Sequence, residues 1–388
     1  MQRKKESSMD QIKNFYKNKK ILVTGATGFK GSWLCSWLLE LGAKVYGTGF
    51  TPNQNKNLFY DLKLNKRINL KIIDIRDYNK LKKFIHKIKP NIIFHLAAQP
   101  LVIDSYLKPI DTFNINVNGT INILDVMRSC NFVKSFIGVT SDKCYENVGK
   151  KRGYSETDKL GGSDPYSASK AATELVINSY YKSFFSSKKN CGISSVRAGN
   201  VIGGGDWSKN RLIPDCIRSL LINKEIFLRN PNYTRPWQHV LEPLKGYLIL
   251  AKKQFENPRK FSGAWNFGSS PNSIKSVKKI TELIIESWGE GKIRSKKNNF
   301  EEQKYLQITS HKSKKYLKWK PIFNIKKAVK VTSDWYLRVE KKNEDPIEIT
   351  SQQINDYMLN NKKKILKQIY NLLKRKKYSK KKKKFIEN

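Results

Sequence analysis

The stretch Gly25-Ala26-Thr27-Gly28-Phe29-Lys30-Gly31 decides the fold of this chain. It follows the short apolar run Lys20–Thr24, which is typical of a buried parallel strand. Apolar residues at helical spacing and a glycine stop signal come next: Trp33, Leu34, Trp37, Leu38, Leu41 and Gly42. Glycines spaced GxxGxxG at such a turn let backbone N–H groups approach a pyrophosphate at the positive end of a helix. The stretch therefore predicts a dinucleotide site.

Strand and helix patterns keep alternating beyond this turn. The expected strands are Lys44–Thr48, Leu70–Ile73, Asn91–Leu96, Val133–Thr140 and Ile193–Arg197. The expected helices between them include Leu81–Ile88, Asp111–Met127 and Tyr166–Phe185. Such alternation predicts an α/β fold with a Rossmann-type, doubly wound parallel sheet that helices cover on both faces.

The alternation loosens from about Gly203, where we expect a smaller substrate-binding lobe. Its expected helices are Leu212–Asn223, Ser276–Trp288 and Ile325–Glu340. We divide the chain into a polar N-terminal extension (1–18), an NAD-binding Rossmann domain (19–202), the substrate-binding lobe interleaved with it (203–345), and a basic Lys-rich tail (346–388). We expect the tail to be an appendage that the core chemistry does not need, although Gln353–Lys374 has the spacing of a basic amphipathic helix.

The net charge is the most conspicuous feature of the composition. The 388 residues include 76 Lys+Arg and 32 Asp+Glu, which gives 76 − 32 = +44. The excess is spread along a chain rich in Lys, Asn and Ile, whose codons are A/T-rich, so drift of genome composition explains most of it. A selected polyanion-binding surface is the alternative, chiefly for the tail. We expect no nucleic-acid partner, and at most contact between the tail and an anionic surface.

Other features of the sequence favour the cytoplasm. No run of about 18 uncharged apolar residues occurs, and Met1–Lys20 lacks the apolar segment of a secretory signal. The five cysteines are scattered and form no CxxC pair, so neither a disulfide framework nor a metal site is expected.

The clearest local motif is Tyr166-Ser167-Ala168-Ser169-Lys170. Asp164 and Pro165 form a good helix start, which places Tyr166 and Lys170 one turn apart on a common face. A cation at that distance favours the phenolate, so the tyrosine can act as a base near neutral pH. Ser141, at the end of the expected strand Val133–Thr140, completes the set as a partner of the substrate hydroxyl. An ordinary amphipathic helix is the alternative for the YxxxK spacing alone.

Two further strand ends bear on the cofactor. The second strand ends in Gly47-Thr48-Gly49-Phe50 without an acidic residue, so NAD and NADP both remain open there. We expect Asp74, at the end of the third strand, to meet the adenine edge, with a loop cap or a surface charge as the alternative. The fourth strand ends in His95-Leu96-Ala97-Ala98-Gln99, whose small residues allow close approach of a cofactor, and we expect His95 to be structural.

Together these motifs resemble the extended short-chain dehydrogenase/reductase family of NAD-dependent epimerases and dehydratases. The stretch Val139-Thr140-Ser141-Asp142-Lys143-Cys144-Tyr145 is similar to the nucleotide-sugar 4,6-dehydratases, and most of all to their CDP-glucose branch. Three further stretches resemble that branch: Arg197–Trp207, Arg211–Asp215 and Arg235–Leu244. The likeness covers about residues 17–342 and does not extend to the tail.

The resemblance implies a lyase that converts CDP-D-glucose to CDP-4-dehydro-6-deoxy-D-glucose for deoxysugars of surface polysaccharides such as the lipopolysaccharide O-antigen. Tyr166 takes the C4 hydroxyl proton while hydride passes to NAD, Asp142 protonates the departing C6 oxygen, and the hydride returns to C6. The dTDP-glucose relatives carry Glu as the C5 base where this chain has Lys143. Whether Lys143 is that base, or stabilises the enolate while water takes the proton, stays open.

The resemblance also implies a set of binding residues and a homo-oligomer, either a dimer or a tetramer. The expected cofactor contacts are Gly25, Thr27, Gly28, Phe29, Gly31, Asp74, Ile75, Leu96, Ala97, Ala98, Tyr166 and Lys170. The expected contacts to the nucleotide-diphosphate sugar are Gln99, Asn200, Arg211, Leu212, Arg235 and Asn266, with ordinary surface cations as the alternative for the two arginines. Rival functions are a nucleotide-sugar 4-epimerase, a dehydratase of another nucleotide hexose, and a basic polyanion-binding protein on a non-catalytic Rossmann scaffold.

Overall fold

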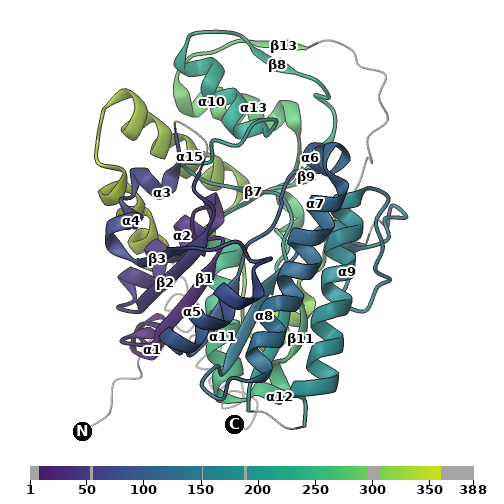
Figure 1. Ribbon diagram of the computed structural model, residues 1–388. Helices are drawn as coiled ribbons and strands as arrows, with labels where there is room; N and C mark the ends of the chain where they lie inside the picture. Colours follow the sequence, from purple (N-terminus) through teal and green to yellow (C-terminus); the bar gives the residue numbers. More distant parts are fainter. Residues whose placement is uncertain (1–7, 53–55, 151, 188–189, 296–305, 360–388) are drawn as a thin grey trace, which may run out of the picture.

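A seven-stranded parallel sheet forms the centre of the molecule. The computed structural model describes residues 8–52, 56–150, 152–187, 190–295 and 306–359. The strand order is β11-β6-β5-β4-β1-β2-β3 (Figure 1). The strands are β1 Lys20–Thr24, β2 Lys44–Gly49, β3 Asn69–Ile72, β4 Ile92–His95, β5 Ser135–Val139, β6 Gly192–Arg197 and β11 Gly263–Asn266. The predicted α/β fold with a Rossmann-type sheet is confirmed.

Apolar residues on both sides of the strands explain why helices cover both faces. In β1, Ile21, Leu22 and Val23 are all fully buried, as expected for a strand inside a parallel sheet. The helices are α1 Ser8–Tyr16, α2 Phe29–Glu40, α3 Leu58–Asp61, α4 Leu64–Arg67, α5 Tyr78–Ile88, α6 Val102–Leu107, α7 Pro109–Phe113, α8 Gly119–Arg128, α9 Pro165–Tyr180, α10 Leu212–Leu221, α11 Leu241–Glu256, α12 Pro258–Phe261, α13 Val277–Trp288, α14 His311–Tyr316 and α15 Ile325–Tyr336. Six of them are short turns of helix between the longer ones: α3, α4, α6, α7, α12 and α14.

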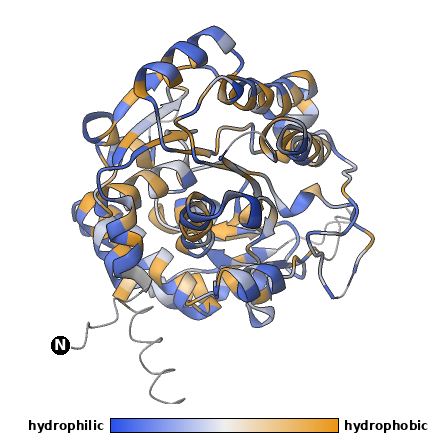
Figure 2. Ribbon diagram, turned by 90° about the horizontal axis from the view of Figure 1, so that it is seen from below, coloured by the Kyte–Doolittle hydropathy of each residue, from blue (hydrophilic) through white to orange (hydrophobic). Residues whose placement is uncertain are grey.

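Two hydrophobic clusters lie on the two faces of the sheet. One joins Leu81 of α5, Leu124 of α8 and Ile177 of α9. The other, larger cluster takes its residues from α1, α2, α11 and α15. Hydrophobic residues accordingly gather toward the middle of the molecule and hydrophilic ones toward its outside (Figure 2). The helical periodicity of apolar residues predicted these helices because the apolar side of a helix packs on one of the two clusters.

A smaller lobe lies beyond the carboxyl ends of the strands (Figure 1). It contains α10, α13 and three strand pairs: β7 Val201–Ile202 with β10 Gln238–His239, β9 Thr234–Pro236 with β12 Ile274–Ser276, and β8 Ile226–Leu228 with β13 Ile293–Ser295. Between β10 and β12 the chain returns to the sheet, where α11 packs on β5 and β6, and β11 pairs with β6.

Both ends of the described chain pack on the sheet domain. The hydroxyl group of Tyr16 in α1 donates a hydrogen bond to Leu248 O (2.8 Å) in α11. At the other end, residues 346–359 form a helix in which Ile349, Ile354 and Tyr357 are fully buried. The Tyr357 hydroxyl donates to Glu242 Oε2 (2.6 Å). Within the described ranges, the helices are all too short or too polar to span a lipid bilayer.

The expectation that the chain is an appendage from Pro346 onward is therefore wrong for 346–359. The buried side chains Ile349, Ile354 and Tyr357 belong to the larger cluster, whereas the Lys-rich runs of the sequence begin only after residue 359. The rest of the tail, and most of the predicted helix Gln353–Lys374, lie outside the described residues.

Ile354→Ala tests whether the helix 346–359 belongs to the core. Removing this buried side chain should lower the free energy of unfolding by about 2–5 kcal/mol. Leu359→Ala, at a side chain that is 56% exposed on the same helix, is the matched control and should change it by about 0.5 kcal/mol or less. Urea titrations measure both, and equal values for the two variants would contradict the packing described.

Candidate active site

A cavity of about 1420 Å³ opens at the carboxyl ends of the strands, between the sheet and the smaller lobe. Its wall includes the turn Gly25–Gly31 after β1, the residues that follow β4, β5 and β6, and the loops of the lobe. In open α/β sheets this edge is where ligands bind.

The glycine turn lies tightly against the end of β4. Gly25 has φ +71°, and a Cβ there would lie 2.6 Å from Ala97 N. A Cβ on Gly31 would overlap the carbonyl oxygen of Gly25. Gly28 is the residue before α2 and brings no side-chain cap, so the first N–H groups of that helix are left to a ligand. The residues present therefore fit a dinucleotide diphosphate at this turn.

Two elements bring the predicted catalytic residues to one wall of the cavity. Ser141, Asp142 and Lys143 form the turn after β5, and Tyr166 and Lys170 lie on the first two turns of α9. Within the turn, Ser141 Oγ donates to Asp142 Oδ1 (3.0 Å) and accepts from Lys143 N (3.2 Å).

The start of α9 sets the position of the tyrosine. Asp164 Oδ1 accepts from Ser167 N (2.9 Å), and Pro165 occupies the first helical position, as the sequence predicts. Lys170 Nζ then donates to Val139 O (3.4 Å) at the end of β5. The YxxxK motif is thus fixed at its N-terminal cap and at its lysine.

Burial dominates the protonation of Tyr166 and Lys170. It raises the pKa of Tyr166 to about 12, and the hydrogen bond with Ser141 only partly offsets this. Burial also lowers the pKa of Lys170 to about 8. The expectation that Lys170 makes the tyrosine a base near neutral pH is therefore not met by these residues alone, because loss of hydration outweighs the hydrogen bond with Ser141 and the charge of Arg211.

The environment of Asp142 suits an acid. Its carboxyl group is buried, and burial raises its pKa above the ordinary value, although Lys143, Ser141 and Arg235 oppose the shift. A carboxyl group with a raised pKa can hold a proton near neutral pH and donate it to a leaving oxygen.

A buried ion pair holds α9 to the strands that carry the other residues. Glu174 of α9 accepts from Arg197 Nε (2.8 Å) and Nη2 (2.7 Å) in β6. It also accepts from Thr140 Oγ1 (2.5 Å), directly before Ser141. Burial alone raises the pKa of Glu174, but Arg197 and the hydroxyl donors bring it below its ordinary value. This carboxylate therefore stays ionised and links both halves of the catalytic wall.

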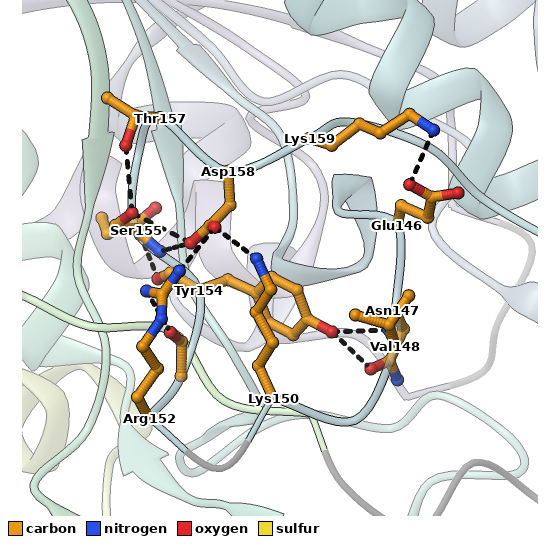
Figure 3. A network of polar contacts seen from close by, with 12 residues as sticks. Glu146, Asn147, Val148, Lys150, Arg152, Tyr154, Ser155, Thr157, Asp158 and Lys159 are labelled. Atoms are coloured by element: carbon orange, nitrogen blue, oxygen red, sulfur yellow. Dashed lines mark hydrogen bonds and ion pairs between the residues drawn. The ribbon is translucent and has the colours of Figure 1, made fainter.

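A second network orders the loop that runs from the Ser141 turn to α9 (Figure 3). Asp158 accepts from Lys150 Nζ (2.6 Å), Arg152 Nη2 (2.7 Å) and Ser155 N (2.7 Å). These donors hold the pKa of Asp158 well below its usual range. The Tyr154 hydroxyl accepts from Val148 N (2.7 Å) and closes the same loop.

The cavity wall contains most of the other predicted binding residues. They are Gly25, Thr27, Gly28, Phe29, Gly31, Ile75, Leu96, Ala97, Ala98, Gln99, Asn200, Arg211, Leu212 and Arg235. His95 lies behind the wall as a structural residue, as predicted: it is buried, with Thr24 on Nδ1 (2.7 Å) and Thr120 on Nε2 (3.0 Å).

Two predicted residues lie away from the cavity wall. Asp74 forms an ion pair with Arg76, whose Nη2 donates a hydrogen bond to Asp74 Oδ2 (2.7 Å). Asn266 is fully buried and holds Tyr145 and Tyr154, with Oδ1 accepting from Tyr145 OH (2.9 Å). Their side chains bond to a charged neighbour on the same loop and to a buried tyrosine pair, and their roles as ligand contacts stay predictions.

Sequence reasoning also missed two residues of the wall. Lys30, inside the glycine turn, faces the cavity, and Asp206 pairs with Arg211 (3.1 Å). A lysine within a glycine-rich turn is the signal that could have drawn attention to Lys30. In the part of the chain that the structure describes, no cluster of three His, Cys, Asp or Glu side chains is placed to hold a metal ion.

Comparison with known proteins gives concordant results. The family described as GDP-mannose 4,6 dehydratase matches residues 22–332. The CDP-glucose 4,6-dehydratase of Salmonella typhimurium is 42% identical over 352 residues, which cover 89% of this chain and 98% of the relative. The solved structure of a dTDP-glucose 4,6-dehydratase from Bacillus anthracis in complex with NAD has a TM-score of 0.69 at 22% identity, covering 84% of this chain and 99% of that one. A UDP-glucose 4-epimerase from Thermotoga maritima, with UDP-glucose, has a TM-score of 0.71 at 22% identity and the same coverage.

Arg197→Met tests the buried ion pair. Glu174 would be left as an uncompensated buried carboxylate, so the free energy of unfolding at pH 8 should fall by about 3–5 kcal/mol. Without Arg197 the folded-state pKa of Glu174 rises, so the deficit should shrink as the pH falls toward 5.

Arg128→Met is the matched control, because Arg128 pairs with Asp125 at a side chain that is 47% exposed. That loss should be about 1 kcal/mol or less. A similar loss for both variants, or a deficit in Arg197→Met that does not depend on pH, would contradict the role given to the pair.

Proposed function

The chain belongs to the GDP-mannose 4,6-dehydratase family, and within that family we propose that it is an NAD-dependent CDP-glucose 4,6-dehydratase. The enzyme converts CDP-D-glucose to CDP-4-dehydro-6-deoxy-D-glucose and water, for deoxysugars of surface polysaccharides. The observation that carries the proposal is the convergence of Ser141, Asp142, Lys143, Tyr166 and Lys170 on one cavity wall, next to a dinucleotide turn. The extent of the likeness to a CDP-glucose 4,6-dehydratase supports the choice of nucleotide.

The turn after β1 is proposed to hold NAD. The backbone of Gly25–Gly31 receives the diphosphate, and Ile75, Leu96 and Ala97 line the same side of the cavity. When bound, the oxidised cofactor accepts a hydride, later returns it, and adds the positive charge that Tyr166 needs to lose its proton. Gly49 and Phe50 at the end of β2 offer no carboxylate to a ribose, so the preference for NAD over NADP rests on the family.

The catalytic roles follow from the chemistry of each group. Tyr166 takes the proton of the C4 hydroxyl, which Ser141 holds by a hydrogen bond, and C4 becomes a ketone as its hydride leaves to the oxidised cofactor. The ketone acidifies the hydrogen on C5, so that water can be eliminated across C5 and C6. Asp142 gives its proton to the departing C6 oxygen. Lys143 either takes the C5 proton or stabilises the enolate while water takes it.

The lobe side of the cavity is proposed to bind the nucleotide diphosphate. Arg211, Leu212 and Arg235 line the cavity from the lobe, and Gln99 and Asn200 line it from the ends of β4 and β6. Guanidinium groups suit a diphosphate because their planar fork donates paired hydrogen bonds. Arg211 is held at the wall by Asp206, and this partner limits its motion before the substrate arrives.

The direct test is turnover of nucleotide sugars by the purified protein. With CDP-glucose and NAD, the product should be a 4-ketone that is lighter by one water, and CDP-glucose should be preferred over the dTDP, UDP and GDP hexoses. Mass spectrometry of the product reads this result. An isomer of unchanged mass would instead identify a 4-epimerase, and no reaction with any sugar would leave the polyanion-binding alternative.

Asp142→Asn should separate oxidation from elimination. The amide can no longer donate an acidic proton, so turnover should fall by a factor of about 10²–10⁴ while C4 oxidation continues. Bound NADH should accumulate and be visible as its absorbance. Asp104→Asn, at an exposed carboxylate on the same cavity wall, is the control and should turn over normally. Normal turnover by Asp142→Asn would overturn the acid assignment.

A further inference from the structure

Lys30 is a cation of the cavity wall that the proposed reaction does not use. It is the second residue of α2, between Phe29 and Gly31, and is only partly exposed. It belongs to the cavity wall together with the catalytic residues of α9. Among the described residues, none accepts a hydrogen bond from its ammonium group or forms an ion pair with it. A lysine that enters a cavity without a partner is placed to meet a ligand.

The charges around Lys30 are mostly of its own sign. Burial, Arg211 and Lys170 together lower the pKa of Lys30 to about 8, although Asp142 opposes them. Asp142 is itself shared with Lys143 and Arg235. In the protein without ligands, the cations of this region therefore outnumber the carboxylates that could compensate them.

The position of Lys30 in the helix makes its positive charge still less favourable. Lys30 lies in the first turn of α2, where the helix dipole is positive and a cation is unfavourable. Gly28 offers no side chain to offset the dipole. An anion at this point would meet the ammonium group, the guanidinium of Arg211 and the free N–H groups of the helix together.

We propose that Lys30 binds a diphosphate group in the cavity, as a charged counterpart to the backbone of the glycine turn. The proposal rests on the proposed function, which supplies two diphosphates, one in the cofactor and one in the nucleotide sugar. Both have the same chemistry. Lys30 belongs to the turn proposed for the first diphosphate, and the charge of Arg211, proposed for the second, acts on it. The charge of Lys30 is thus costly in the free protein and favourable once a diphosphate is bound.

This combination gives a signature that a merely structural lysine does not produce. Lys30→Met keeps the length of the side chain and removes its charge. Without added ligand, the variant should melt at the same temperature as the wild type or higher. It should nevertheless bind a diphosphate more weakly, by a factor of about ten or more, as expected for a lost hydrogen bond to a charged group.

The experiment measures melting temperature and ligand affinity on the full chain. NAD released from each purified protein is quantified first, and then NAD+ and CDP are titrated separately by calorimetry. Lys30→Arg should bind nearly as well as the wild type, because it retains the charge. Lys209→Met, at an exposed lysine on the same cavity wall, should bind both ligands as the wild type does.

Each outcome decides the proposal. Weaker binding of NAD+ alone assigns Lys30 to the cofactor diphosphate, and weaker binding of CDP alone assigns it to the substrate diphosphate. Unchanged affinity for both, or a lower melting temperature of Lys30→Met than of the wild type when both proteins are free of NAD, overturns the proposal. If the wild type forms the 4-ketone while Lys30→Met binds normally, only the role of Lys30 fails. If the wild type neither binds these ligands nor forms product, the proposed function fails as well.

Discussion

The cavity wall that carries Ser141–Lys143, Tyr166 and Lys170 depends on the bonds that the Glu174 carboxylate makes. It lies on α9, one turn after Lys170, and bonds to Thr140 at the end of β5 and to Ser195 and Arg197 in β6. These contacts fix the helix that carries the tyrosine relative to the turn that carries the proposed acid. A buried ion pair is weak evidence for stability, because desolvation offsets much of its attraction. Its value here is geometric, since the proposed reaction moves a hydride and three protons between groups on different elements.

Electrostatics in the cavity separates useful charge from background charge. The net charge of +44 is spread along the chain and says little about function. The cavity, by contrast, concentrates Lys30, Lys170, Arg211 and Arg235 around two buried carboxyl groups, those of Asp142 and Asp206. A protein that binds two diphosphates needs such a local excess of positive charge, and the cost of holding it without ligand is repaid on binding.

The sequence predicted the parts of the structure that depend on local periodicity. The apolar run of β1 and the capped start of α9 each follow from a few neighbouring residues, so strands, helices and the YxxxK face agree with the structure. Long-range contacts could not be predicted. Asn266 accepts a hydrogen bond from Tyr145, which is far away in sequence, and the pKa of Tyr166 depends on burial that no motif reveals. The sequence did not indicate that the helix 346–359 is packed, because the Lys-rich residues that follow it dominate the composition of residues 346–388.

In the proposed reaction, one site removes a hydride from C4 of the sugar and returns it to C6 of the same molecule. The decisive measurement supplies CDP-glucose with deuterium at C4 and locates the label in the product by nuclear magnetic resonance. Deuterium should appear in the C6 methyl group, with none lost to solvent. Deuterium that stays on C4, or a C6 methyl group without label, would contradict it.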